Sequence, residues 1–274
     1  MEDLSDEAPE DVPDLSPLLH RIVIDHPDEF VRELTGVTAP WVKKFGPIRP
    51  WFRGMPRLSF SLEPSLLRYR AKGLNLNVVA NNLSRQFQNY GARLLDEFPA
   101  ANDLELLTVM QHHGIPTRLL DWTENAFAAL YFAVRQFEHL NDPEDAIVWM
   151  LEPLQLAKIK GCDGIPFSDP QLAGYGNLPL PFYPVHRSPR VTPQRGTFTV
   201  HPLAPQHALM KLALKEVRDG GLSPLVGIRI RGNRRAFIRG ALVGAFGQGE
   251  FTFFPDLDGL ARELRIREGL EGKG

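Results

Sequence analysis

A polar run near the middle of the 274-residue chain constrains the fold more than any other segment. Residues 111–123 read QHHGIPTRLLDWT, so imidazole, guanidinium, carboxylate, hydroxyl and indole groups alternate with apolar residues. Apolar residues recur at helical spacing before and after this run, which predicts a helix over residues 103–111 and a second helix with Thr123 as its N-cap. We therefore expect the run to be a loop between two helices that lies against the core.

Two charged residues of this run flank a pair of leucines. Leu119 and Leu120 are expected to face the core, and Arg118 and Asp121 would be drawn inward with them. A buried guanidinium needs a carboxylate or a ligand as its partner. The sequence therefore predicts that Arg118 and Asp121 are buried and paired with each other.

The adjacent imidazoles of His112 and His113 argue against a metal site. On a helix they diverge by about 100°, so they cannot chelate one ion as an i, i+4 pair can. An unperturbed imidazole titrates near ~6.5, which makes His113 a candidate general acid or base. The alternative is a histidine that caps the helix end before Gly114. No metal is expected.

The distribution of apolar residues along the chain predicts one α+β domain over residues 16–270. Early helices followed by mostly late strands favour a mixed or antiparallel sheet with flanking helices. Residues 161–193 are rich in proline and glycine, which indicates an irregular excursion that fits a lid. Further helices are expected at residues 18–34, 78–95, 127–137 and 257–266, and strands at 51–53, 146–151, 197–200, 225–230 and 250–254.

Charge is distributed unevenly, although the formal net charge is only −2. Residues 2–14 hold seven acidic residues and no Lys or Arg, so residues 1–15 are expected to form an acidic flexible arm that offers a tether to a partner. Residues 220–249 hold no acidic residue and five arginines, at positions 229, 231, 234, 235 and 239. This group indicates either a face for nucleic acid or phosphate, or partners for acidic side chains elsewhere.

Composition excludes several protein classes. No apolar run approaches the ~18 residues of a membrane span, and the acidic start does not have the pattern of a signal peptide, so the cytoplasm is the expected compartment. Cys162 is the only cysteine, which excludes an internal disulfide and a cysteine-rich zinc site. Nucleophile-elbow, Walker and dinucleotide-fingerprint motifs are absent.

Four sequence blocks, in order, resemble the signature of the FRG domain family. The first is the aromatic-Arg-Gly motif that gives the family its name. The blocks, with signature motifs over 51–260, are WFRG at 51–54 with LEPSLLR at 62–68, the central HGIPTRLLDWT at 113–123, PQRGTFTVH at 193–201 and FFPDLDGL at 253–260. The resemblance implies a bacterial or phage-linked cytoplasmic protein that acts as a toxin or defence effector.

The order of the short motifs is also similar to the plan of ADP-ribosyltransferases. Those enzymes place an arginine on an early strand, hydroxyl residues on a middle strand, and a glutamate two positions after Gln or Glu near a late strand. The corresponding motifs here are FRG at 52–54, TFT at 197–199 and QGE at 248–250. The resemblance implies NAD as substrate, with a protein or nucleic acid as acceptor. The motif order implies Glu250 as a catalytic residue, and Arg53 and Thr199 as binding residues. The polar run adds His113 as a catalytic candidate, and Arg118, Asp121 and Thr123 as binding candidates.

This transferase hypothesis has a physical basis, and it has two alternatives. An arginine fork binds phosphate or ribose oxygens, a carboxylate stabilises the cationic sugar, and Gly54 is expected to let a ligand approach the chain. The first alternative is a non-enzymatic module in which Arg53, His113, Arg118 and Asp121 bind a nucleotide or peptide. The second is a nucleic-acid-processing enzyme that uses the arginines of residues 229–239. Convergence of Arg53, the 113–123 segment and Glu250 would favour a transferase.

Overall fold

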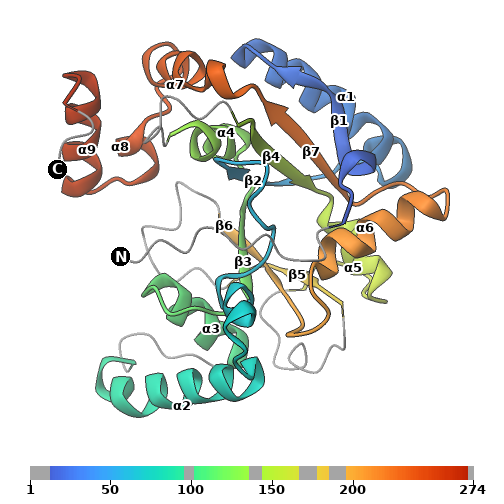
Figure 1. The fold of residues 1–274 in the computed structure, drawn as a ribbon, viewed down its shortest axis with the longest axis vertical. Coiled ribbons are helices and arrows are strands. Elements are labelled where there is room, and N and C mark those ends of the chain that lie inside the picture. Colours follow the sequence, from blue (N-terminus) through green and yellow to red (C-terminus); the bar gives the residue numbers. More distant parts are fainter. Residues whose placement is uncertain (1–12, 96–101, 136–143, 167–177, 185–195, 271–274) are drawn as a thin grey trace.

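Seven strands form one mixed sheet in the computed structural model, which describes residues 13–95, 102–135, 144–166, 178–184 and 196–270. The strand order is β1-β7-β4-β2-β3-β6-β5, with β1 and β7 parallel and the other neighbours antiparallel (Figure 1). The strands are β1 (Leu19–Ile24), β2 (Trp51–Met55), β3 (Leu119–Thr123), β4 (Ala146–Leu151), β5 (Leu180–Phe182), β6 (Gly196–Val200) and β7 (Leu225–Ile230). The predicted α+β domain with a mixed sheet is confirmed.

Helices flank this sheet on both faces. The α-helices are α1 (Pro27–Phe45), α2 (Leu76–Leu95), α3 (Asp103–His112), α4 (Ala126–Val134), α5 (Pro153–Ile159), α6 (Ala208–Arg218), α7 (Arg235–Gly244), α8 (Glu250–Phe253) and α9 (Leu257–Arg267). Short 3₁₀ turns are η1 (Ser16–Leu18), η2 (Ser65–Lys72) and η5 (Gly232–Arg234). Within the described residues, no helix has the length and apolar character to cross a membrane.

Alternation along the strands divides the apolar residues between two cores. Phe52 of β2 and Val148 of β4 face the core that α1, α4 and α7 cover, whereas Trp51 and Trp149 face the core that α5 and α6 cover. Neighbouring residues point to opposite faces because the side-chain period of a strand is two. Every residue of β4 is buried, as its uninterrupted apolar sequence predicts.

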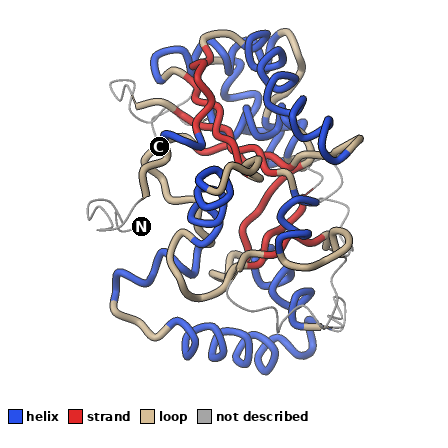
Figure 2. Tube along the Cα trace, turned by 90° about the vertical axis from the view of Figure 1, so that its right-hand side faces the viewer, coloured by secondary structure: helices blue, strands red, loops and turns tan. Residues whose placement is uncertain are grey.

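The pairing between strands is nearly interrupted at the junction of β2 and β3. β2 pairs with β4 along its whole length, but it pairs with β3 at a single position, Phe52 opposite Thr123. β3 in turn pairs fully with β6. Figure 2 shows the resulting upper and lower groups of strands. The two strand groups are therefore joined by one residue pair of the ladder, and the candidate site lies at this junction.

Three predicted elements are wrong. Residues 18–34 form η1, β1 and the start of α1, because β1 pairs with β7 and Pro27 begins a helix with a capping box from Glu29. Residues 119–123 are strand β3 and not a loop, since β6 pairs with all five of them. Residues 250–254 begin as helix α8, which buries Glu250 and Phe253.

Other expected elements are confirmed. Helices α2, α3, α4 and α9 and strands β2, β4, β6 and β7 occupy the predicted segments. Asn125, and not Thr123, caps α4, because its side chain accepts from the amides of Phe127 and Ala128. Most of the predicted acidic arm (residues 1–12) and much of the predicted excursion (167–177 and 185–193) lie outside the described residues.

Candidate functional site

Arg53 is held in place by close packing of its two neighbours in β2. Phe52 is buried in the core, as expected. Gly54 lies against α4 so closely that a Cβ atom there would stand 1.8 Å from the backbone oxygen of Ala129. The expectation that Gly54 leaves room for a ligand is therefore wrong, because α4 occupies that space. The motif instead fixes the backbone from which the Arg53 side chain extends.

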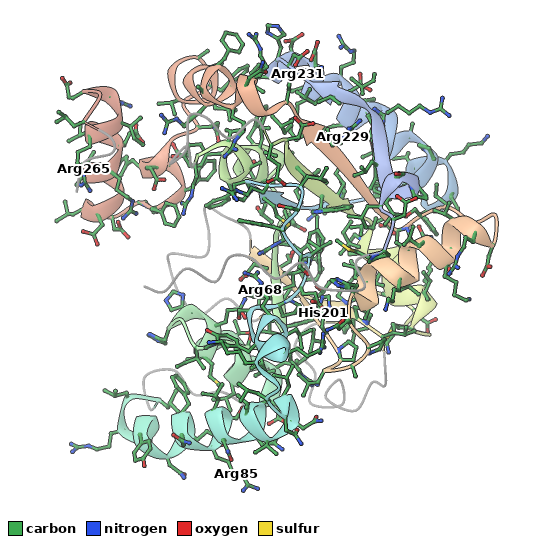
Figure 3. The ribbon with its side chains drawn as sticks, in the orientation of Figure 1. Arg68, Arg85, His201, Arg229, Arg231 and Arg265 are labelled. Carbon is green, nitrogen blue, oxygen red and sulfur yellow. The ribbon has the colours of Figure 1, made fainter. Side chains whose placement is uncertain are left out.

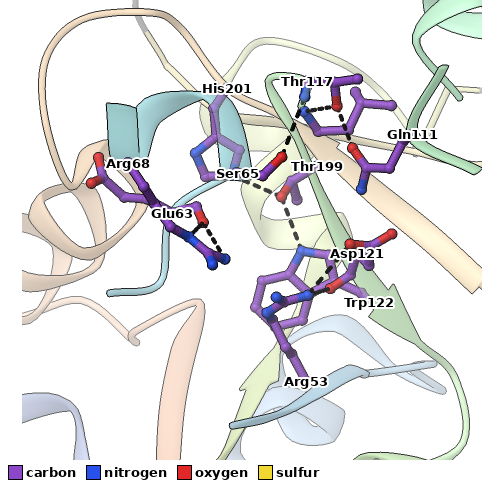
Figure 4. Close-up of polar contacts among 11 residues, drawn as sticks. Arg53, Glu63, Ser65, Arg68, Gln111, Thr117, Asp121, Trp122, Thr199 and His201 are labelled. Atoms are coloured by element: carbon purple, nitrogen blue, oxygen red, sulfur yellow. Dashed lines mark hydrogen bonds and ion pairs between the residues drawn. The ribbon is translucent and has the colours of Figure 1, made fainter. Parts of the chain in front are cut away.

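The guanidinium of Arg53 crosses the junction between β2 and β3. Its Nη1 donates to the backbone oxygen of Asp121 at 2.8 Å and lies 3.7 Å from the Oδ2 atom of Asp121 (Figure 4). Burial lowers the pKa of Arg53, and the charge of Asp121 opposes that shift. An arginine stays protonated in proteins, so the junction holds a largely enclosed cation.

A second guanidinium, that of Arg68, lies close enough for its charge to act on Arg53. Arg68 on η2 donates from Nε and Nη2 to the backbone oxygen of Glu63 at 3.3 and 3.2 Å. Its pKa is lowered by burial of the guanidinium, although part of the side chain is exposed, and the charges of Asp121 and Glu63 raise it. The charge of Arg68 also lowers the pKa of Arg53. We call Arg53, Arg68 and Asp121 the Arg53 cluster. The cluster consists of two cationic side chains and one exposed carboxylate.

A buried hydrogen-bond chain supports the cluster. Trp122 Nε1 donates to Thr199 Oγ1, which is 2.9 Å from His201 Nε2. An indole N–H is only a donor, so we assign the Thr199 proton to the bond with His201, whose Nε2 then accepts. Burial, with a smaller contribution from Arg53, lowers the pKa of His201 to about 3. His201 is therefore neutral near pH 7, and a network without charge supports the two cations.

Loops on the Arg68 side are fastened by Glu63. Its buried carboxylate accepts from the amide of His207 at 2.9 Å and pairs with Arg70 at 3.5 Å. The Ser65 hydroxyl accepts from the amide of Thr117 at 3.3 Å, which ties η2 to the segment before β3. Such bonds fix the geometry of the side chains around the Arg53 cluster.

Of the predicted binding residues, Arg53 and Asp121 are brought together, but Arg118 and Asp121 are not paired. Asp121 has an exposed side chain and turns to Arg53. Burial lowers the pKa of Arg118, and its electrostatic partner is Asp103. The predicted buried pair is wrong because Arg118 lies before β3, whereas the Asp121 side chain is exposed beside Arg53.

The other predicted hydroxyl and imidazole residues lie in supporting positions. Thr199 is fully buried, and its hydroxyl is engaged by Trp122 and His201. Thr123 Oγ1 accepts from the amide of Asn125 at 3.0 Å, in the turn that leads to α4. His113 is exposed at the C-cap position of α3, as the capping alternative predicted.

Glu250 belongs to a different cluster. It is buried, accepts from the Tyr131 hydroxyl at 3.1 Å, and pairs with Arg135 at 3.5 Å and Arg262 at 3.1 Å. These partners fasten α8 to α4 and α9. Within the part of the chain that the structure describes, Glu250 and Arg53 share no hydrogen-bond or ion-pair partner. The structure therefore does not bring Glu250 together with Arg53.

The arginine-rich segment is largely engaged in contacts within the protein. Arg231 pairs with Asp25, Arg234 donates to the backbone oxygen of Asp25, and Arg239 donates to the backbone oxygen of Arg135. Arg235 is buried. Figure 3 shows Arg229 and Arg231 well away from Arg68 and His201. These contacts favour the ion-pair interpretation of the segment.

Three residues that build the site were missed by the sequence reasoning: Glu63, Arg68 and His201. All three lie inside motif blocks that resemble the FRG signature. Their position in those blocks was the sequence feature that could have identified them. Their sequence spacing gives no indication of contact, because the long-range fold brings residues 63–70 beside residues 199–207.

Part of the chain, including the Arg53 cluster, is similar to a known family. Residues 49–142 match the family model of the FRG domain, and this range includes Arg53, Arg68 and Asp121. The FRG domain match covers residues 49–142, and the rest of the chain lies outside it. No curated protein and no solved structure matches the chain. The matched range covers all three members of the Arg53 cluster, whereas Thr199 and His201 of the supporting chain lie beyond it.

Proposed function

We propose that the FRG domain binds a phosphate-bearing nucleotide at the Arg53 cluster. The observation that carries the proposal is that the charges of Arg53 and Arg68 act on each other's surroundings and on one exposed carboxylate, that of Asp121. Guanidinium groups bind phosphate through paired, charge-assisted hydrogen bonds. Partial burial strengthens such bonds because water screens the charges less.

Unused hydrogen-bond donors support this proposal. Within the described residues, Arg53 makes one hydrogen bond, through Nη1 to the Asp121 backbone oxygen, and its Nε is buried without a partner. Arg68 uses Nε and Nη2 on Glu63 and keeps Nη1. Figure 4 shows both guanidinium ends directed to the same region, beside Trp122. An anion there would receive donors from both arginines without displacing the backbone bonds that hold them.

NAD turnover is the second candidate function. The proximity of Asp121 to Arg53 favours it, because a carboxylate beside a phosphate-binding arginine is suited to stabilise a cationic ribose. The predicted carboxylate, Glu250, is instead engaged with Arg135 and Arg262. We therefore assign the reacting carboxylate of this second candidate to Asp121. Its acceptor, protein or nucleic acid, and a role as toxin or defence effector belong to the same proposal.

One set of titrations separates these functions. Purified full-length protein is titrated by calorimetry with NAD, ADP-ribose and ADP, and nicotinamide release from NAD is followed in parallel. Binding of at least one of these ligands without nicotinamide release supports a recognition module. Binding with nicotinamide release that Asp121→Asn abolishes, while the variant still binds NAD, supports the transferase. Failure of all three ligands to bind contradicts nucleotide binding at this site.

A further inference from the structure

We propose that Asp121 makes the Arg53 cluster selective for ligands that carry a ribose diol, an inference that rests on the proposed nucleotide binding. The proposal gives the site a ligand class narrower than phosphate alone. It also gives a role to the exposed carboxylate, which is not needed to hold Arg53 in place.

The first argument is the unusual exposure of Asp121. The side chains of the other four residues of β3 are buried, whereas that of Asp121 is 58% exposed. Its backbone is fixed in register opposite Phe198 and by the bond from Arg53 to its backbone oxygen. The site therefore presents a carboxylate at a fixed position and open to solvent.

The second argument is that the carboxylate is not committed to Arg53. The Oδ2 atom lies 3.7 Å from Nη1, which is longer than a hydrogen bond, whereas the backbone oxygen accepts from the same Nη1 at 2.8 Å. The guanidinium would thus stay in place if the carboxylate turned to a ligand. Arg53 thus contacts the carboxylate at ion-pair distance and hydrogen-bonds the backbone oxygen.

The third argument is electrostatic. A phosphate group on Arg53 and Arg68 would be repelled by the adjacent carboxylate, which lowers affinity for an anion that brings no donor. A vicinal diol supplies two O–H donors to the two acceptor oxygens. Ribose and phosphate are neighbours in a nucleotide, and acidic residues bind ribose hydroxyls beside phosphate sites in dinucleotide-binding folds. Asp121 therefore opposes bare phosphate and favours a ribose phosphate.

A matched ligand pair tests the inference. ADP and 2′,3′-dideoxy-ADP differ only in the diol, and their dissociation constants are measured by calorimetry on wild type, Asp121→Asn and the control Asp219→Asn. We expect wild type and the control to prefer ADP by about tenfold, the effect of a hydrogen bond to a charged group. In Asp121→Asn the preference should fall to within about twofold as the dideoxy ligand gains affinity and ADP loses it.

The outcomes separate this inference from the proposed function. Equal affinity of wild type for the two ligands overturns the inference and leaves nucleotide binding standing, and this comparison does not depend on the variant folding. An unchanged tenfold preference in folded Asp121→Asn also overturns it. Binding of neither ligand to wild type overturns it as well, and the proposed function then stands only if NAD or ADP-ribose binds.

Discussion

Arg53 donates a hydrogen bond across the β2–β3 junction to the backbone oxygen of Asp121, at 2.8 Å. The two strands share one ladder pair there, so a side-chain donor satisfies a strand carbonyl where the backbone pairing has ended. The same bond anchors the guanidinium while leaving its other donors available. Arg53 thus joins the two strand groups and also presents a cation at the candidate site.

Gly54 gives the most direct test of why the motif contains glycine. Gly54→Ala places a Cβ 1.8 Å from the backbone oxygen of Ala129, so β2 or α4 must shift. We expect a loss of about 3 kcal/mol in the free energy of unfolding, the upper range for overpacked cores. Gly240→Ala is the matched control, because it lies in α7 with open space and should be neutral or stabilise by up to ~1 kcal/mol. Urea unfolding measures both. Equal stability of the two variants contradicts the packing explanation.

Glu250 is expected to act on stability. Glu250→Gln keeps the size of the side chain but removes the charge that faces Arg135 and Arg262. We expect a loss of about 2 kcal/mol, below the usual cost of breaking a fully buried pair because both arginines are partly exposed. Asp219→Asn removes one carboxylate from the exposed pair with Lys215 and should cost under ~0.5 kcal/mol. A Glu250→Gln protein with wild-type stability and lost NAD turnover would restore Glu250 as a catalytic residue.

His201 makes stability depend on pH. Its folded pKa of about 3 lies below the ordinary value, so between the two values the unfolded chain binds a proton that the native protein does not. The stability that depends on neutral His201 is fully present above pH ~6.5. It is lost as the pH falls toward the pKa of His201 in the folded protein. Between pH 7 and pH 5, His201→Gln should lose about 2 kcal/mol less stability than wild type. Urea titrations at both pH values measure this, with exposed His113→Gln as control. The same pH dependence in His201→Gln would show that His201 is not the group responsible.

Periodicity predicted the elements that bury one clear face or both faces. β4 is apolar throughout, and α3 repeats Leu104, Leu107 and Met110, so length and spacing identify both elements. β3 was missed because it is short and presents the charged Asp121 within an otherwise buried strand. Its strand character comes from pairing with β6, which lies far away in the sequence. Tertiary pairing decided the structure where local pattern was ambiguous.

The candidate site was predictable in its residue types and less so in its contacts. The motif blocks indicated Arg53 and Asp121, but the sequence predicted the nearby Arg118 as the partner of Asp121. The actual partner comes from another strand, 68 positions away. Glu250 was placed by analogy of motif order, whereas its partners depend on how α8 packs between α4 and α9. Contacts between segments distant in sequence cannot be read from spacing along one chain.

The most direct test of nucleotide binding is the ADP dissociation constant of wild type, Arg53→Lys, Arg68→Lys and Arg231→Lys, measured by calorimetry. Lysine keeps the charge and loses the planar fork, so Arg53→Lys and Arg68→Lys should each weaken binding by about tenfold or more. Arg231→Lys, in an exposed pair with Asp25 apart from the cluster, should bind as wild type does. Equal weakening in all three variants, or none in the cluster variants, would contradict binding at the Arg53 cluster.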